Sequence, residues 1–368
     1  MAILAFDIGG TAVKYGVFQN GILQETSSFS TPETWAEMKA ELLKVKTAFS
    51  KNIDGIAISS PGSVDSETGI IHGISAIPYI HHFPIVAELE QLFQLPVSIE
   101  NDANCAGLAE VAFGVAKEVQ NAAFFIVGSG VGGAVIINRQ LLKGKNLFGG
   151  EFGYMLMSPT ETLSPLASPV QTARHYSELA GLPTAISGKE LFALADEGNE
   201  DAQEAVSSLY DALSRGIYNV LMVLDPDIVA IGGGISQRVG LRKEVAQRVV
   251  KLLEQTGAMD LKFQLEICQF QNNANLLGAV SNFLNQKGTK YEHLIGNDKR
   301  PLLIIMLAKD RYRELNAKIL KESLEKIENP KDENIVLLLS HRPEFVPEYT
   351  EERKNRFCIY RTCTWWAI

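Results

Sequence analysis

The chain has 368 residues, 46% of them hydrophobic and 21% charged, which is ordinary for a globular protein and long enough for more than one domain. Its formal net charge of -9 argues against nucleic-acid binding, because phosphate contacts require Lys and Arg. The four cysteines form no C-x-x-C pair, no run of about 18 apolar residues occurs, and the N-terminus does not read as a signal peptide, so we expect a cytoplasmic protein without a membrane span or a zinc site built on cysteines.

The predicted elements begin with a β-hairpin whose first turn is rich in glycine. A strand at Ile3–Phe6 ends at the turn 7–11, and a second strand follows at Val13–Phe18. Apolar residues three and four positions apart predict a helix from Pro32 to Ser50. A buried strand at 55–60 then ends at Pro61-Gly62.

A further apolar strand, 97–100, runs directly into Asn101 and Asp102, and a helix is expected over Ala103–Phe113. The strand–turn–strand unit at 122–137 then repeats the pattern of the N-terminal hairpin. Two copies of one unit predict a duplicated architecture with two similar lobes.

The last part of this region alternates strands and helices. A strand at 228–231 precedes Gly232-Gly233-Gly234, a helical stretch is expected from about Ser236, and a final helix covers Ala274–Asn285. This alternation predicts an α/β fold.

Glycine-rich turns follow three of the buried strands, at Gly9-Gly10, at 128–133 and at 232–234. A phosphate group needs backbone N–H groups close by, and a Cβ atom would hold the backbone away from it. One such loop could be an ordinary tight turn, but three of them at strand ends predict a nucleotide phosphate site.

Asp7 and Asp102 both lie at the carboxyl ends of predicted strands, where open α/β sheets bind ligands. A kinase needs one carboxylate for Mg²⁺ and one that accepts the proton of the substrate hydroxyl. Asp102 taken alone could merely cap the helix that follows it.

Six segments in order resemble the ROK family (repressors, open reading frames and kinases) over about residues 1–287. They are Asp7–Thr11, Ser60–Asp65, Glu100–Asn104, Gly128–Gly133, Gly149–Gly153 and Ile231–Ser236. The resemblance implies a two-lobed, actin-like ATPase fold of the hexokinase type, which is ribonuclease H-like, with lobes at 1–115 and 116–287. The last helix, 274–287, would pack back on the first lobe.

The resemblance also implies an ATP-dependent hexose kinase that phosphorylates a sugar hydroxyl, O6 by expectation. Asp102 would be the general base, and Asp7 would hold Mg²⁺ together with ATP. The implied sugar-binding residues are Gly62, Asn101, Asp102, Glu151 and Tyr154. The implied ATP and Mg²⁺ site comprises Asp7, Gly9, Gly10, Thr11, Lys14, Gly130, Gly132, Gly133, Gly232, Gly233 and Gly234.

The sequence departs from the family pattern after Gly149-Gly150. Many members carry a His at the position of Tyr154, followed by a cysteine-rich zinc motif, whereas Met155–Thr172 contains no Cys. We therefore expect no structural zinc and an altered sugar pocket, with glucose, N-acetylmannosamine and β-glucosides as candidate substrates. Homodimers are common in the family. His72, His81 and His82 match no recognised metal motif.

Residues 288–368 differ from the rest of the chain and are expected to lie outside the kinase. Residues 289–368 carry a net charge of +2, against -11 for the preceding 288 residues. Strands at Pro301–Leu307 and Asn334–Leu339 around a helix at Arg313–Glu328 predict a βαβ fragment, and Ser340-His341 resembles part of a calcineurin-like metallophosphoesterase. A lone His341 cannot form a two-metal site, so we expect no phosphoesterase activity.

The final residues, Phe357–Ile368, suggest how such a fragment arose. One back-translation of this segment, read one nucleotide out of frame, contains the Gly-His-x-His motif of the phosphoesterases. The hypothesis is a remnant joined by a deletion or a frame error.

Two alternatives to an active kinase remain. One is a sugar-binding pseudokinase. The other is a transcriptional regulator of the same family, which the acidic charge and a first strand starting at Ile3 disfavour, because that start leaves no room for a helix-turn-helix.

Overall fold

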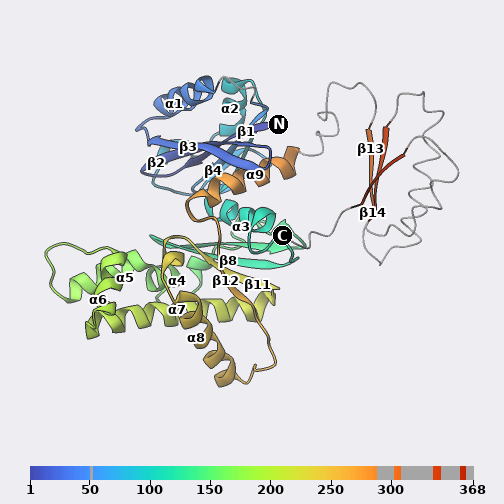
Figure 1. Cartoon of the computed structure of the whole chain (residues 1–368). Helices are drawn as coiled ribbons and strands as arrows, with labels where there is room; N and C mark the ends of the chain where they lie inside the picture. The colour runs from blue at the N-terminus through green and yellow to red at the C-terminus, as the bar shows by residue number, and fades with distance from the viewer. Residues whose placement is uncertain (50–52, 288–301, 308–334, 341–356, 362–368) are drawn as a thin grey trace. The chain divides into compact units, whose positions relative to one another are not determined.

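The computed structural model describes residues 1–49 and 53–287, and in the tail the backbones of three strands, β13 (Leu302–Leu307), β14 (Ile335–Ser340) and β15 (Phe357–Arg361). The chain divides into two compact units, Met1–Gln286 and Lys287–Ile368, and each is described by itself (Figure 1).

The first five-stranded sheet contains the N-terminal hairpin and has the strand order β3-β2-β1-β4-β7. The first three strands in this order pair antiparallel, and the last three pair parallel. The strands are β1 (Ala2–Ile8), β2 (Ala12–Gln19), β3 (Ile22–Ser30), β4 (Gly55–Ser60) and β7 (Val97–Asn101).

The second five-stranded sheet repeats this arrangement with the order β10-β9-β8-β11-β12, again antiparallel and then parallel. Its strands are β8 (Ala122–Val127), β9 (Val131–Ile137), β10 (Gln140–Leu141), β11 (Ile228–Gly232) and β12 (Leu265–Ile267). The duplication predicted from the two glycine-containing hairpins is therefore confirmed by the topology of the two sheets.

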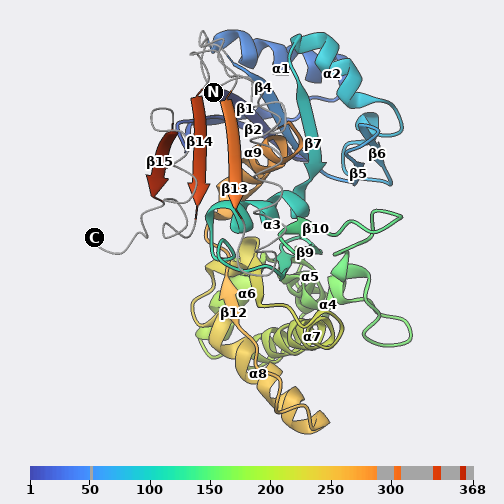
Figure 2. The ribbon, with the colours of Figure 1, turned by 90° about the vertical axis from the view of Figure 1, so that its right-hand side faces the viewer.

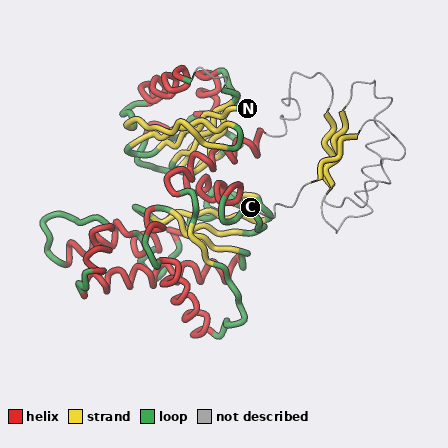
Figure 3. Tube along the Cα trace, viewed as in Figure 1, coloured by secondary structure: helices red, strands yellow, loops and turns green. Residues whose placement is uncertain are grey.

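The outer face of each sheet is covered by helices that bury its apolar side chains (Figure 3). On the first sheet these are α1 (Trp35–Ala48) and α2 (Ile85–Phe93), with a small hairpin of β5 (Ser63–Asp65) and β6 (Ile70–His72) beside them. On the second sheet the covering helices are α4 (Leu163–Ala167), α5 (Pro169–Leu179), α6 (Gly188–Asp196), α7 (Glu200–Leu224) and α8 (Leu241–Thr256).

Two helices, α3 (Asp102–Phe113) and α9 (Ala274–Lys287), lie between the sheets (Figures 1 and 2). The α9 helix contacts both β4 of the first sheet and the helix α3 so closely that glycine is required at the contacts. A Cβ on Gly55 would lie 2.1 Å from Cζ of Phe283, and one on Gly278 would lie 1.7 Å from the carbonyl oxygen of Cys105. The end of the unit Met1–Gln286 thus returns to its beginning.

The helix expected from about Ser236 begins later, at Leu241. Residues Gly234–Gln237 form a short 3₁₀ helix instead, and Gly240 then has a φ of +83°, which breaks the helical path before α8. The glycine at this position permits the left-handed conformation.

In the tail, β13, β14 and β15 form a parallel three-stranded sheet. The two predicted tail strands are present, and β15 was not predicted. The expected helix at 313–328 and His341 lie outside the described residues. Within the described parts of the chain, no helix combines the length and the apolar character that crossing a membrane requires.

Candidate functional site

Asp7 lies near the end of β1 and faces α9 rather than the apolar core. Side chains alternate along a strand, and the neighbours Phe6 and Ile8 belong to the apolar core between the first sheet and the helices α1 and α2. Asp7 is 7% exposed, and its Oδ1 accepts hydrogen bonds from Ser59 Oγ at 2.9 Å and from Asn275 Nδ2 at 3.0 Å. Lys14 Nζ lies 3.9 Å from Oδ2. One carboxylate oxygen is thereby held by two donors from distant parts of the chain.

The turn after β1 is narrow, and Thr31 closes it. The Thr31 hydroxyl donates a hydrogen bond to the carbonyl oxygen of Gly9 at 2.5 Å, and the Thr31 N–H donates to the carbonyl oxygen of Thr11 at 3.1 Å. A Cβ on Gly10 would lie 2.9 Å from the Cβ of Ala76. Glycine at this position therefore lets the turn pack against Ala76.

The second glycine turn lines a cavity of about 510 Å³. Gly128, Gly130 and Gly132 form one side of it, and Asp102 and Asn275 also line it. A Cβ on Gly130 would lie 2.8 Å from Ser164 Oγ, the group that accepts a hydrogen bond from the N–H of Val131. A backbone cradle of this kind is what a phosphate group requires.

Gly133 and the glycines at 232–234 do not line this cavity. Gly133 packs within β9, where a Cβ would lie 2.7 Å from the carbonyl oxygen of Gly150. A Cβ on Gly232 would lie 2.9 Å from Cδ1 of Ile126, whose residue does line the cavity, so Gly232 packs against a residue of the cavity wall.

Asp102 is the first residue of α3, and its Oδ1 accepts a hydrogen bond from the N–H of Ala103 at 2.8 Å. Burial raises the pKa of this carboxyl group to about 6, and the negative charges of Asp7 and Glu151 add to the rise. Two carboxylates predicted from separate motifs, Asp7 and Glu151, are therefore close enough to act on Asp102. A carboxylate with a raised pKa in a cavity is suited to accept a proton.

A second cavity, of about 750 Å³, lies beside Asn101 and contains most of the expected sugar-binding residues. Gly62, Asn101, Glu151 and Tyr154 line it. Burial raises the pKa of Glu151. Tyr154 lines both cavities, so the two cavities adjoin at the start of α3, where Asn101 faces one and Asp102 the other.

Asn101 is held in place before any ligand binds. Its Oδ1 accepts from the N–H of Asn104 at 3.1 Å and so caps α3, and its Nδ2 donates to the carbonyl oxygen of Gly62 at 3.0 Å. Gly62 has a φ of +97°, which favours glycine, and a Cβ there would lie 2.9 Å from Cε1 of His81.

Sequence reasoning missed Asn275, Lys143 and Glu100. Asn275 contacts Asp7 from the far end of the catalytic unit, and a pattern along the chain gives no sign of a contact between residues 268 positions apart. Lys143 contacts Glu100 from a loop that carries no recognised motif. Glu100 was quoted as part of a motif but was given no role.

The described residues contain no group of three or more His, Cys, Asp or Glu side chains arranged to hold a metal ion. Asp7 nevertheless fits Mg²⁺, because this ion takes oxygen ligands and is commonly bound by one or two carboxylates together with substrate phosphates. The glycine cradle beside Asp102 fits those phosphates.

Two sheets of identical order, with helices between them and glycine turns at their ends, define the class: a two-lobed, actin-like ATPase fold. The chain belongs to the ROK family, whose sequence profile matches residues 3–286. The resemblance seen in the sequence motifs is confirmed. The profile ends before the tail.

Named relatives of the chain are sugar kinases. A β-glucoside kinase of Listeria monocytogenes is 35% identical over 296 residues, which cover 78% of this chain and 99% of that protein. An N-acetylmannosamine kinase of Vibrio vulnificus is 33% identical over 77% of this chain and 98% of that protein.

Solved structures of other ROK family proteins are similar to this chain. A ROK family protein of Streptococcus pneumoniae in complex with sucrose has a TM-score of 0.73 and 36% identity, with 78% of this chain and 100% of that chain covered. A ROK glucokinase of Streptomyces griseus in complex with glucose and AMPPNP has a TM-score of 0.64 and 23% identity over 76% of this chain and 98% of that chain, which supports the fold.

Proposed function

We propose that this chain is an ATP-dependent hexose kinase that transfers the γ-phosphoryl group of ATP to a sugar hydroxyl, O6 by preference. The observation that carries the proposal is the junction of two cavities at the start of α3. The glycine-lined cavity contains Asp102, and the adjoining cavity contains Asn101 and Glu151. Because Asp102 lines the first cavity and its chain neighbour Asn101 lines the second, a phosphate donor and a hydroxyl acceptor bound in these cavities would meet at Asp102.

In this proposal Asp102 accepts the proton of the attacking hydroxyl, while Asn101 and Glu151 orient the sugar through its other hydroxyls. Asn101 has one free N–H and one free lone pair on its amide for this purpose, since its two hydrogen bonds use only half of its capacity. The chemistry requires no covalent intermediate, so positioning and charge stabilisation are sufficient.

Asp7 would hold Mg²⁺ directly or through water, and the ion would offset negative charge on the phosphates of ATP. The N–H groups of Ser129 and Gly130 in the 128–132 turn would bind those phosphates, since the N–H groups of Gly128 and Val131 already donate to the carbonyl oxygen of Gly130 and to Ser164 Oγ. Gly9, Gly10, Thr11 and Lys14 would lie on the other side. Gly232, Gly233 and Gly234 are assigned to the adenosine side, behind Ile126.

We propose β-glucosides as the substrates, ahead of N-acetylmannosamine and glucose. The cavity of about 750 Å³ lies within the range that accepts drug-sized ligands, about 300–1,000 Å³. Phe148 and Tyr154 line it with side chains that are 59% and 69% exposed and ring centroids 5.8 Å apart. Exposed aromatic rings at its edge would stack on a second ring of the substrate. The β-glucoside kinase relatives agree with this choice.

A cytoplasmic location and a homodimer are part of the same proposal. The described cysteines, Cys105 and Cys268, are free and buried, as expected in a reducing compartment. A zinc-free pocket is proposed because Tyr154 and the cysteine-free segment after it replace the family's zinc motif.

The test is ADP formation from ATP and Mg²⁺ with glucose, mannose, fructose, N-acetylmannosamine, N-acetylglucosamine and cellobiose. Turnover with cellobiose that falls by about 10²–10⁴-fold in Asp102→Asn would support the proposal, since this is the usual contribution of a general base. Turnover with another sugar would keep the kinase and reassign its substrate. Binding of a sugar without turnover would identify a pseudokinase.

A further inference from the structure

The start of α3 is tied to the second sheet by a buried ion pair between Glu100 and Lys143. The Lys143 Nζ atom lies 3.0 Å from Glu100 Oε2, and the two side chains are 19% and 1% exposed. Glu100 belongs to β7 of the first sheet, whereas Lys143 follows β10 of the second. The pair therefore joins β7 to the loop after β10. Both segments line the cavity of about 750 Å³, here called the sugar-side cavity.

The ammonium group of Lys143 has a partner for each of its three N–H groups. It donates to the carbonyl oxygen of Val64 at 2.7 Å and to Ser66 Oγ at 3.0 Å in addition to Glu100. Complete matching fixes the side chain in one position. Lys143 also lines the sugar-side cavity.

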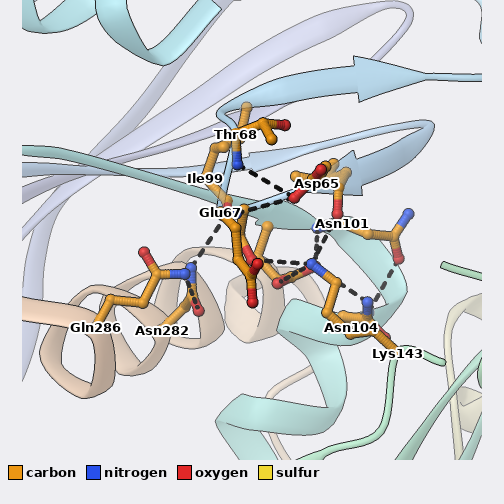
Figure 4. A network of polar contacts seen from close by, with 12 residues as sticks. Asp65, Glu67, Thr68, Ile99, Asn101, Asn104, Lys143, Asn282 and Gln286 are labelled. Carbon is orange, nitrogen blue, oxygen red and sulfur yellow. Dashed lines mark hydrogen bonds and ion pairs between the residues drawn. The ribbon is translucent and has the colours of Figure 1, made fainter. Parts of the chain in front are cut away.

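The second oxygen of Glu100 acts on the neighbouring site residues. Glu100 Oε1 accepts from the backbone N–H of Asn101 at 2.8 Å and from Asn104 Nδ2 at 3.1 Å. The N–H of Asn104 donates to the Asn101 side chain, and both residues lie in the polar network that Figure 4 shows together with Lys143. The orientation of Asn101, and of Asp102 after it, thus depends on a carboxylate that Lys143 holds.

The backbone of Lys143 supports the loop that carries Glu151, on the other wall of the sugar-side cavity. Its carbonyl oxygen accepts from the N–H of Gly149 at 2.8 Å and closes the loop that ends at Glu151. A Cβ on Gly149 would lie 2.2 Å from the carbonyl oxygen of Leu142, so the loop is tightly closed. Lys143 thereby contacts Glu100, which binds the backbone of Asn101, and also Gly149 in the loop that leads to Glu151.

We propose that Lys143 is a positioning residue for the sugar: paired with Glu100, it holds Asn101 and Asp102 on one wall and Glu151 on the other in a fixed separation. The inference rests on the proposed function. Stability alone is a weak reason for such a pair, because replacing a buried ion pair by apolar groups is often neutral or stabilising. Fixing the distance between two walls is a role that an apolar pair would not fill.

The test compares the full-length protein with Lys143→Met, Glu100→Gln and the double variant. The matched control is Lys189→Met, which removes an exposed lysine on α6. Sugar affinity is measured by titration calorimetry, KM for sugar and for ATP and kcat by ADP release, and Tm by thermal unfolding. Wild type and Asp102→Asn are run in parallel.

We expect Lys143→Met to lower kcat/KM for the sugar by about 10- to 100-fold, because misplacement of about 1 Å can cost 10²-fold, while KM for ATP changes less than about twofold. The double variant should recover part of the Tm lost in Lys143→Met, since the unpaired buried carboxylate is removed, but not the sugar affinity. Lys189→Met should match the wild type.

The proposal is overturned if Lys143→Met lowers Tm but leaves the sugar affinity and kcat/KM within about twofold of the wild type. It is also overturned if the double variant regains full activity. If the wild type binds sugar without turnover, the kinase proposal fails, but Lys143→Met should still weaken sugar binding. If the wild type neither binds nor converts a sugar, both proposals fail.

Discussion

At the residue scale, the carboxyl group of Asp102 has to be ionised to accept a proton, and its pKa is raised to about 6 by burial and by the charges of Asp7 and Glu151. We therefore expect kcat/KM for the sugar to be constant above pH 7 and to fall tenfold per pH unit well below pH 6. The measurement is ADP release between pH 5 and 8.5 with thermal unfolding checked at each pH. A profile still flat at pH 5 would exclude Asp102 as the base.

The same shift has a consequence for stability. The pKa is higher in the folded protein than the ordinary value of 3.8, so the folded state binds the proton more tightly, and stability falls as the pH rises from about 4 to 6. Above pH 6 the full cost of the buried charge is present. Asp102→Asn removes this cost, which is roughly 3 kcal/mol for a pKa raised from 3.8 to about 6, so we expect a Tm higher by several degrees at pH 7.5. A lower Tm at that pH would contradict the assignment.

At the scale of elements, the turn after β11 contains two glycines with different requirements. Gly233 has a φ of +79°, and a Cβ there would lie 2.3 Å from the carbonyl oxygen of Val127, whereas a Cβ on Gly234 would meet nothing within 4 Å. We expect Gly233→Ala to lower the free energy of unfolding by about 1–3 kcal/mol and Gly234→Ala to change it by less than about 0.5 kcal/mol.

Gly234→Ala then reports on the nucleotide. If Gly234 lies against adenosine, its added methyl group should raise KM for ATP severalfold at unchanged Tm. Both variants are compared by chemical denaturation and by ATP titration of ADP release. Equal destabilisation by the two substitutions would show that the turn has a different conformation.

The elements predictable from the sequence are those with local signals. The β1–β2 and β8–β9 hairpins follow from apolar strands around glycine turns, and α3 follows from an apolar strand that runs into Asn101 and Asp102. The residue that caps α3 is Asn101, whereas the sequence suggested Asp102 for this place. The fully buried strands β4 and β11 also have continuous apolar runs. Local patterns predict these elements because the residues that form each signal lie within the element or a few residues from it.

The contacts that complete the site are long-range. Asn275 reaches Asp7, and Lys143 reaches Glu100, through packing of segments that no local pattern connects. The placement of Gly133 inside β9, rather than on the cavity, depends on the path of residues 149–153 across the strand. Spacing in the sequence identified candidate residues, but their distances depend on how α9 and the 142–151 loop pack.

At the scale of the whole molecule, the unit Met1–Gln286 contains both sheets, both cavities and α9. The family profile ends at residue 286, and the relatives are matched over nearly their full length. We expect a chain that ends at Lys287 to keep kcat and both KM values within about twofold and to unfold cooperatively. The comparison with the full chain uses ADP release and calorimetry. Inactivity of the shortened chain would assign a function to the tail.

The return of α9 to the first sheet also sets an order of events during synthesis. Asp7 emerges from the ribosome first, but its partner Asn275 follows 268 residues later. At the usual rate of translation, about 5–20 residues per second, this interval is roughly 13–54 s. During that time β4 lacks the side chain of Phe283, which in the folded protein packs directly on Gly55. The first lobe therefore reaches its final packing only after the last helix of the unit has been made.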